Sequence, residues 1–89
     1  MAEHFGYRVV GTITAVKGNC YAGHKVGDEF ELSINDAAGL CGMFYHDIYP
    51  YIMLFQLGGE WPWAKDKDVD VRECADRHNA VQIELRRIR

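Results

Sequence analysis

The spacing of apolar side chains changes twice along this chain, and these changes constrain the fold more than any other feature. Residues 7–16 are rich in β-branched types with a rough period of two, and residues 28–34 alternate cleanly between apolar and polar side chains. Residues 69–74 alternate weakly and residues 81–86 alternate strongly. Because successive side chains of a strand point to opposite faces of the sheet, these segments are predicted to be four strands of a sheet with one face toward water.

Between the two strand pairs, apolar side chains recur at helical spacing. The residues that share this predicted face are Leu40, Met43, Phe44, Ile48, Tyr51, Ile52 and Phe55. Asn35 is the expected N-cap, with Asp36 in the first turn, and Gly58 follows the expected end. Pro50 lies inside this segment, where a proline removes one helical hydrogen bond and clashes with the preceding turn. We therefore expect one long helix that is kinked or broken near Pro50.

These elements predict an α+β fold with the order β-β-α-β-β. The expected arrangement is a mainly antiparallel four-stranded sheet with the helix on one face, and 89 residues suit a single domain over residues 1–89. One helix covers only one face of such a sheet, and five tyrosines, four phenylalanines and two tryptophans exceed what one small core needs. A homo-oligomer is therefore expected.

Charge and hydropathy exclude several classes of protein. Ten Lys and Arg against 13 Asp and Glu give a net charge of −3, which argues against nucleic acid as a partner. The most apolar segment, residues 43–57, is interrupted by His46, Asp47 and Gln56, so no membrane span is expected. The first residues do not combine a basic region with an apolar core. No secretion signal is expected, and a soluble cytoplasmic protein is predicted.

The three cysteines, Cys20, Cys41 and Cys74, are the first candidates for chemistry. Their odd number and wide spacing argue against a disulfide framework and against a Cys-x-x-Cys redox motif. Thiolates are soft ligands that suit zinc, copper(I) or iron–sulfur clusters. Three thiolates could hold a four-iron cluster that leaves one iron open to another ligand, and His24 is a candidate fourth ligand.

Other interpretations of the same thiols stay open. His24 and His78 each follow a cysteine by four positions, a spacing that also allows a tetrahedral Cys2His2 zinc site. Free cysteines often pack as small apolar side chains, and Cys41 falls on the apolar face of the predicted helix. Cys20 and Cys74 are candidates for a nucleophilic or redox thiol. Cys20 and Cys41 can meet only if residues 21–27 fold back over the sheet, because the strand leads away from Cys20 faster than the helix returns.

Aromatic side chains form a second group of candidates. Trp61 and Trp63 flank a proline in a predicted loop, where an indole can cover a pocket or anchor a subunit contact. Tyr45 and Tyr49 lie off the main apolar stripe of the helix and favour a second interface. These four residues are the candidates for binding a small-molecule ligand or cofactor, and simple core packing is the alternative.

Asp47 is a third candidate, because its helical angle falls inside the apolar sector. A partly buried carboxylate can act as a general acid or base, or it can pair with an arginine such as Arg8 or Arg72. His46 is expected to point away from Asp47. Residues 86–89, which contain three arginines, are expected to be a solvated strand end.

The motifs of this chain also occur together in a known family. They are Cys20-x-x-Gly-His-Lys-Val-Gly-Asp-Glu-Phe30, Ile48-Tyr-Pro-Tyr51, Gly58-Gly-Glu-Trp-Pro-Trp63, Cys74-x-Asp76 and a final strand from Val81 to Ile88. In this respect the chain, from about Tyr7 onward, resembles a family of small uncharacterised proteins about ninety residues long, found mainly in anaerobic bacteria and archaea. The resemblance implies a soluble, stand-alone domain and supplies no activity.

Three functions remain as hypotheses. The first is a cysteine-ligated metal or iron–sulfur protein that uses Cys20, Cys41, Cys74 and His24. The second is a small oligomeric enzyme with an aromatic pocket around Trp61 and Trp63, in which a thiol or Asp47 supplies the chemistry. The third is an interaction module or accessory subunit without chemistry of its own.

Overall fold

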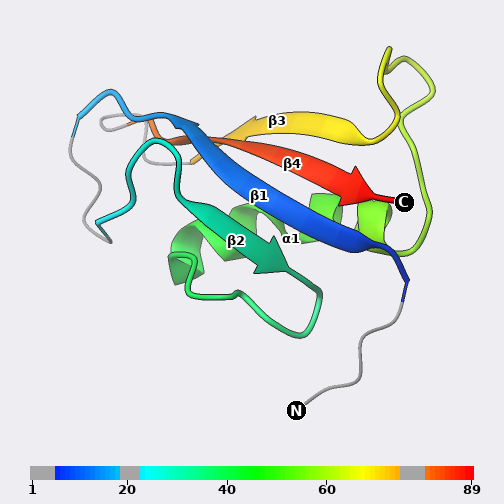
Figure 1. Cartoon of the computed structure of the whole chain (residues 1–89), viewed down its shortest axis with the longest axis horizontal. Coiled ribbons are helices and arrows are strands. Elements are labelled where there is room, and N and C mark those ends of the chain that lie inside the picture. Colours follow the sequence, from blue (N-terminus) through cyan, green and yellow to red (C-terminus); the bar gives the residue numbers. More distant parts are fainter. Residues whose placement is uncertain (1–5, 19–22, 75–79) are drawn as a thin grey trace.

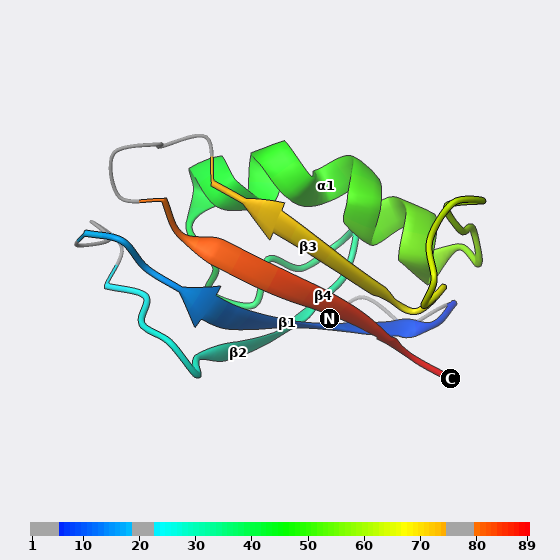
Figure 2. The same cartoon turned by 90° about the horizontal axis from the view of Figure 1, so that it is seen from above.

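The computed structural model describes residues 6–18, 23–74 and 80–89. In these residues it contains four strands and one helix: β1 (Arg8–Ala15), β2 (Glu29–Leu32), α1 (Gly42–Gln56), β3 (Val69–Glu73) and β4 (Gln82–Ile88). The strands form one antiparallel sheet in the order β2-β1-β4-β3 (Figure 1). Figure 2 shows α1 lying along one face of this sheet. The predicted α+β fold and its element order are therefore confirmed.

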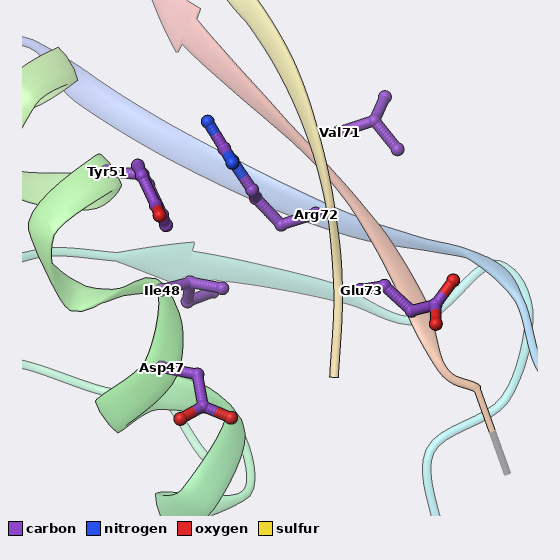
Figure 3. A pocket seen from close by; sticks show the side chains of 6 residues that line it. All are labelled: Asp47, Ile48, Tyr51, Val71, Arg72 and Glu73. Carbon is purple, nitrogen blue, oxygen red and sulfur yellow. The ribbon is translucent and has the colours of Figure 1, made fainter. Parts of the chain in front are cut away.

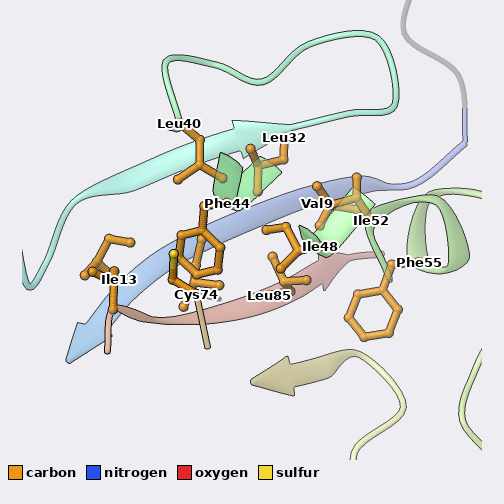
Figure 4. Close-up of a cluster of buried hydrophobic side chains, with 12 residues drawn as sticks. Val9, Ile13, Leu32, Leu40, Phe44, Ile48, Ile52, Phe55, Cys74 and Leu85 are labelled. Carbon is orange, nitrogen blue, oxygen red and sulfur yellow. The ribbon is translucent and has the colours of Figure 1, made fainter. Parts of the chain in front are cut away.

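The alternation of side chains along the central strands decides which face α1 covers. Val9, Gly11 and Ile13 of β1 are buried beneath the helix, as are Ile83 and Leu85 of β4. The core that they form with α1 is drawn in Figure 4. Burial of such aliphatic side chains stabilises the fold by about 1.5–3 kcal/mol each.

The opposite face of the sheet carries polar and charged side chains. Arg8 on β1 forms an ion pair with Glu31 on β2 (2.6 Å), and Arg86 and Glu84 form another along β4 (2.9 Å). Thr14 donates a hydrogen bond to the side chain of Gln82 across the same face. This face is therefore largely suited to contact with water, although Val71 (48% exposed) and Ile88 (38% exposed) also lie on it.

The helix begins later than the sequence predicted. Residues 33–39 form turns instead: the backbone groups of Ser33 and Asp36 bond to each other, and the Asp36 carboxylate accepts a hydrogen bond from the backbone of Ala38 (2.8 Å). Ala38 and Gly39 then take positive φ angles of 54° and 88°, through which a right-handed helix cannot run. The predicted N-cap at Asn35 is therefore wrong, and Cys41 takes that position.

The helix is not broken at Pro50, contrary to one of the two expectations for this residue. α1 runs through Pro50 to Gln56, and Pro50 itself is exposed. Its missing N–H leaves the carbonyl of His46 without a helical partner, and the exposed side of the helix lets water take that place. Met43 was also misplaced in the predicted apolar face: it is 51% exposed, because it lies about 100° around the helix from buried Phe44.

The C-terminal arginines differ sharply from one another. Arg86 and Arg89 are exposed, whereas the side chain of Arg87 is fully buried. Its guanidinium donates hydrogen bonds to the carbonyls of Gly59 (2.6 Å), Lys67 (2.8 Å) and Phe55 (3.2 Å) and to the carboxylate of Asp68 (2.9 Å). The expectation of a solvated strand end is therefore wrong for Arg87. Strand alternation turns this residue toward the helix, where its charge meets the carbonyl of Phe55 in the last turn of α1 and two carbonyls of the segment that follows.

No helix in the described ranges is both long and apolar enough to cross a membrane.

Candidate functional site

Two of the three cysteine positions lie at one end of the molecule. Cys41 precedes the first residue of α1, and Cys74 follows the last residue of β3. The described parts of the connection between β1 and β2, residues 16–18 and 23–28, lie at the same end of the sheet (Figures 1 and 2). Cys20 and His78 lie outside the described residues, so the predicted ligand set is seen only in part.

His24 joins the connection between β1 and β2 to the start of the helix. The backbone N–H of Cys41 donates a hydrogen bond to Nε2 of His24 (3.0 Å). The imidazole also packs edge-to-face against Phe30, with ring centroids 5.0 Å apart. The described part of the predicted fold-back, residues 23–27, therefore does reach α1, and His24 lies beside Cys41.

This hydrogen bond restricts how His24 could bind a metal. An Nε2 that accepts an N–H belongs to a neutral imidazole whose proton is on Nδ1. A metal bound at Nε2 would displace the hydrogen bond to Cys41. A metal bound at Nδ1 would require that proton to move to Nε2, which could then no longer accept from Cys41. His24 could therefore bind a metal only by giving up this hydrogen bond.

The two described thiols have different surroundings. Cys74 is only 7% exposed and belongs to the apolar core that also contains Phe44 (Figure 4). Cys41 is half-buried and packs against the edge of the same core. The packing role that the sequence suggested for Cys41 therefore suits Cys74 better. Among residues 6–18, 23–74 and 80–89, no three His, Cys, Asp or Glu side chains come together as a metal site.

A separate pocket of about 330 Å³ lies between α1 and β3. Its lining residues are Asp47, Ile48 and Tyr51 from the helix and Val71, Arg72 and Glu73 from the strand (Figure 3). The side chains of Asp47 and Arg72 lie on the same side of β3, whereas Val71 and Glu73 point away from the helix (Figure 3). Since Val71 and Glu73 nevertheless line the pocket, we infer that it extends to the outer edge of β3.

Arg72 is the main charged group in this pocket. Its Nε donates to the Asp70 carboxylate (2.7 Å), and its Cζ lies 3.7 Å from the centre of the Tyr51 ring. Asp70 and Arg72 stand opposite Leu85 and Ile83 of β4, so both face the helix side of the sheet. The Asp70–Arg72 pair was not among the predicted site residues. The alternation of side chains along β3 would have indicated it, because residues 70 and 72 fall on the same face of the strand as buried Cys74.

The partial burial of Asp47 was predicted correctly, but the direction of its neighbour His46 was not. Its side chain is 31% exposed, as expected for a position inside the apolar sector. However, Nδ1 of His46 is only 3.6 Å from the Asp47 carboxylate, so the expectation that His46 points away is wrong. A side chain that is 89% exposed can turn toward its chain neighbour whatever its helical angle. Arg8, one of the two suggested partners, pairs instead with Glu31, whereas Arg72 shares the pocket with Asp47.

The tryptophans of the predicted aromatic loop lie near Arg72. The ring of Trp61 lies 5.9 Å from that of Tyr51 and stacks on Trp63 at 5.3 Å. Trp63 is 77% exposed, and Lys67 holds the loop by donating to the carbonyl of Trp61 (2.9 Å). In the part of the chain that the structure describes, Trp61 Nε1 is the buried side-chain polar atom with no hydrogen-bond partner.

Tyr45 and Tyr49 lie elsewhere and fasten a loop to the helix. The Tyr45 hydroxyl donates to the carbonyl of Ser33 (2.6 Å), and that of Tyr49 donates to the carbonyl of Ile34 (2.8 Å). Burial, together with Tyr49 and Asp36 nearby, raises the pKa of Tyr45. Since Tyr45 and Tyr49 hold the segment that follows β2, they do not share a cluster with the two tryptophans.

Comparison with known proteins supplies no function for this chain. No known family model matches the chain, and no curated protein or solved structure is detectably similar to it.

Proposed function

We propose that this protein binds a metal ion or an iron–sulfur cluster through Cys20, Cys41 and Cys74, with His24 as the candidate fourth ligand. The observation that carries the proposal is the position of His24 beside Cys41, which the 3.0 Å hydrogen bond from the Cys41 backbone to His24 demonstrates. His24 follows Cys20 by four positions in the sequence. Cys74 ends its strand at the same end of the sheet.

The start of α1 favours a metal site whose protein ligands are soft and negatively charged. Cys41 is the N-cap residue of α1, and its side chain makes no capping hydrogen bond. A helix N-terminus stabilises nearby negative charge, such as that of a metal-bound thiolate or of a cluster with several thiolates. Three cysteines and one histidine make a common zinc set, and three cysteines alone suit a four-iron cluster with one open iron.

The proposal also bears on where the protein works. Thiolate ligands persist in a reducing compartment, because oxidising compartments favour disulfides instead. We therefore propose a cytoplasmic location.

The direct test is elemental analysis of the protein purified without oxygen, together with its absorption spectrum. We expect either stoichiometric zinc or iron with acid-labile sulfide and a brown colour. Separate Cys20→Ala, Cys41→Ala and Cys74→Ala variants should lose the metal. His46→Ala is the matched control, because this histidine lies on α1 and its side chain is 89% exposed.

Thermal unfolding with and without a chelator provides a second measurement. A structural metal contributes its binding free energy to folding, so the chelator should lower the melting temperature of the metal-loaded wild type. It should have no effect on a folded cysteine variant. Wild-type protein that is folded, colourless and metal-free after anaerobic purification would refute the proposal.

A further inference from the structure

β3 has an edge that no strand of the described residues covers. It is the outermost strand on its side of the sheet (Figure 1). The hydrogen bonds from Arg87 N to Asp68 O (2.7 Å) and from Cys74 N to Val81 O (2.8 Å) show that the even-numbered positions of this segment bond toward β4. Because bonding alternates along an antiparallel strand, Val69, Val71 and Glu73 direct their backbone N–H and C=O groups outward.

We propose that β3 pairs with β3 of a second copy of this chain, antiparallel and centred on Val71. In this register Val71 faces Val71 of the second copy, and Val69 faces Glu73. These are the residues whose backbone groups point outward, so each of the three facing pairs can form two backbone hydrogen bonds. The pairing joins two four-stranded sheets into one continuous sheet.

The charges of β3 are self-complementary in this register. Asp70 of each copy stands opposite Arg72 of the other, in pairs whose Cα atoms approach to about 4.5 Å. Within one chain Asp70 and Arg72 already form an ion pair (2.7 Å), with side chains only 16% and 32% exposed. Two copies therefore bring together four charges in which each directly opposite pair has opposite signs.

The pocket between α1 and β3 supports the same partner. It extends to the outer edge of β3 and contains the guanidinium of Arg72 (Figure 3). In the proposed register Asp70 of the second copy projects on the helix side of the sheet, opposite Arg72. The second copy therefore contributes a carboxylate at the mouth of this pocket.

The other edge of the sheet has the opposite character. The bond from Ile13 N to Asp28 O (2.9 Å) shows that the backbone groups of the even-numbered residues in this segment bond toward β1. The backbone N–H and C=O groups of Glu29 and Glu31 therefore point toward the free edge of β2. Self-pairing of β2 centred on Phe30 would place Glu29 opposite Glu31 of the second copy. Pairing centred on Glu31 would place the two copies of this glutamate opposite each other. Like charges at an edge oppose such pairing, so β3 is the edge suited to a second copy.

A charge swap tests the register. The oligomeric state is measured by sedimentation velocity at protein concentrations up to about 1 mM, where even a weak dimer is populated. We expect the wild type to dimerise and Asp70→Arg or Arg72→Asp alone to weaken the dimer about tenfold or more. The double variant Asp70→Arg/Arg72→Asp should restore it, because the swap recreates opposite charges across the interface.

Glu84→Arg is the matched control, because it breaks an ion pair of the same spacing on the interior strand β4 and should leave the dimer unchanged. A wild type that stays monomeric at the highest concentration would overturn the proposal. A folded double variant that fails to dimerise would overturn it as well.

Val71→Pro tests the strand pairing without changing charge. The N–H of Val71 points away from β4, so a proline there removes no hydrogen bond of the monomer and blocks strand addition. Circular dichroism should show a folded protein that sediments as a monomer at every concentration. In the wild type, hydrogen exchange at Val69, Val71 and Glu73 should slow as the concentration rises. A dimer that survives Val71→Pro, or edge amides whose exchange does not depend on concentration, would refute strand pairing.

Discussion

Replacement of Arg87 by methionine should lower the stability of this protein severely. Methionine keeps much of the length and apolar volume of the side chain and removes its charge and its donors. Three backbone carbonyls, those of Phe55, Gly59 and Lys67, then lose a charged donor at the point where the helix, the loop after it and β4 meet. Asp68 loses one of its two arginine partners and keeps Arg89 (2.8 Å).

The expected loss of folding free energy follows from the burial of the Arg87 side chain. The Arg87 side chain is fully buried, and hydrogen bonds to a charged group contribute about 1.5–3 kcal/mol each. Because the Asp68 side chain is 30% exposed and retains Arg89, water and the remaining arginine compensate part of the loss. We expect a net cost of about 3 kcal/mol, at the lower end of the range for breaking a buried ion pair. A small domain has only about 5–15 kcal/mol of stability in all.

Urea unfolding followed by circular dichroism measures this cost. Arg86→Met is the matched control, because the neighbouring arginine is exposed on the open face of the sheet and pairs with Glu84. It should cost no more than about 1 kcal/mol. If the two variants unfold at the same urea concentration, the assignment of Arg87 as the clamp between β4 and the C-terminus of α1 is wrong.

The remaining predictions concern pH, packing and one hydroxyl. Arg87 and, less strongly, Arg89 lower the pKa of Asp68 in the folded protein. The ionised Asp68 therefore contributes its full stabilisation above its pKa in the unfolded chain, about 3.9, and loses it as the pH falls through its lower pKa in the folded protein. Asp68→Asn should make acid unfolding measurably shallower, and an unchanged acid limb would contradict this. Gly11→Ala should cost about 1–3 kcal/mol in urea unfolding, because its Cβ would lie 2.7 and 2.9 Å from side chains of the neighbouring strands. Gly42→Ala, which meets nothing within 4 Å, should be neutral or stabilising; equal costs would refute the packing argument. Tyr45→Phe should cost about 1 kcal/mol, and this variant should lose a step above the ordinary tyrosine range from a spectroscopic titration, because burial raises the pKa of Tyr45. An unchanged titration curve would contradict this.

The metal proposal and the dimer proposal can fail independently. The metal would bind at the end of the sheet where α1 begins, and the dimer depends on the outer edge of β3. Loss of metal in a cysteine variant should therefore leave sedimentation unchanged, provided that the variant folds. The charge swap on β3 should likewise leave the metal content unchanged.

Local periodicity made the elements of this fold predictable. Alternation of side chains identified all four strands to within a few residues, and helical spacing identified the buried stripe of Phe44, Ile48, Ile52 and Phe55. The start of the helix was missed because the Asp36 carboxylate serves equally well in a turn, and the left-handed backbone at Ala38 left no signal in the sequence. Of the candidate site, the sequence predicted the partial burial of Asp47. It also predicted that Cys20 and Cys41 can meet only if residues 21–27 fold back over the sheet, and the described residues 23–27 do approach Cys41 through His24.

The sequence by itself determined which segments become strands and helix and which face of each is apolar, because these depend on neighbours a few positions apart in the chain. Only the tertiary structure decided that β4 lies between β1 and β3, that Arg87 lies beneath the end of the helix, and that Asp70 and Arg72 face the pocket. Those placements depend on hydrogen bonds and burial between segments far apart in sequence. The residues next to an arginine in the sequence are similar whether its guanidinium is solvated or bonds to a distant carbonyl. The packing of β4 against α1 is what buries Arg87 and leaves Arg86 in contact with water.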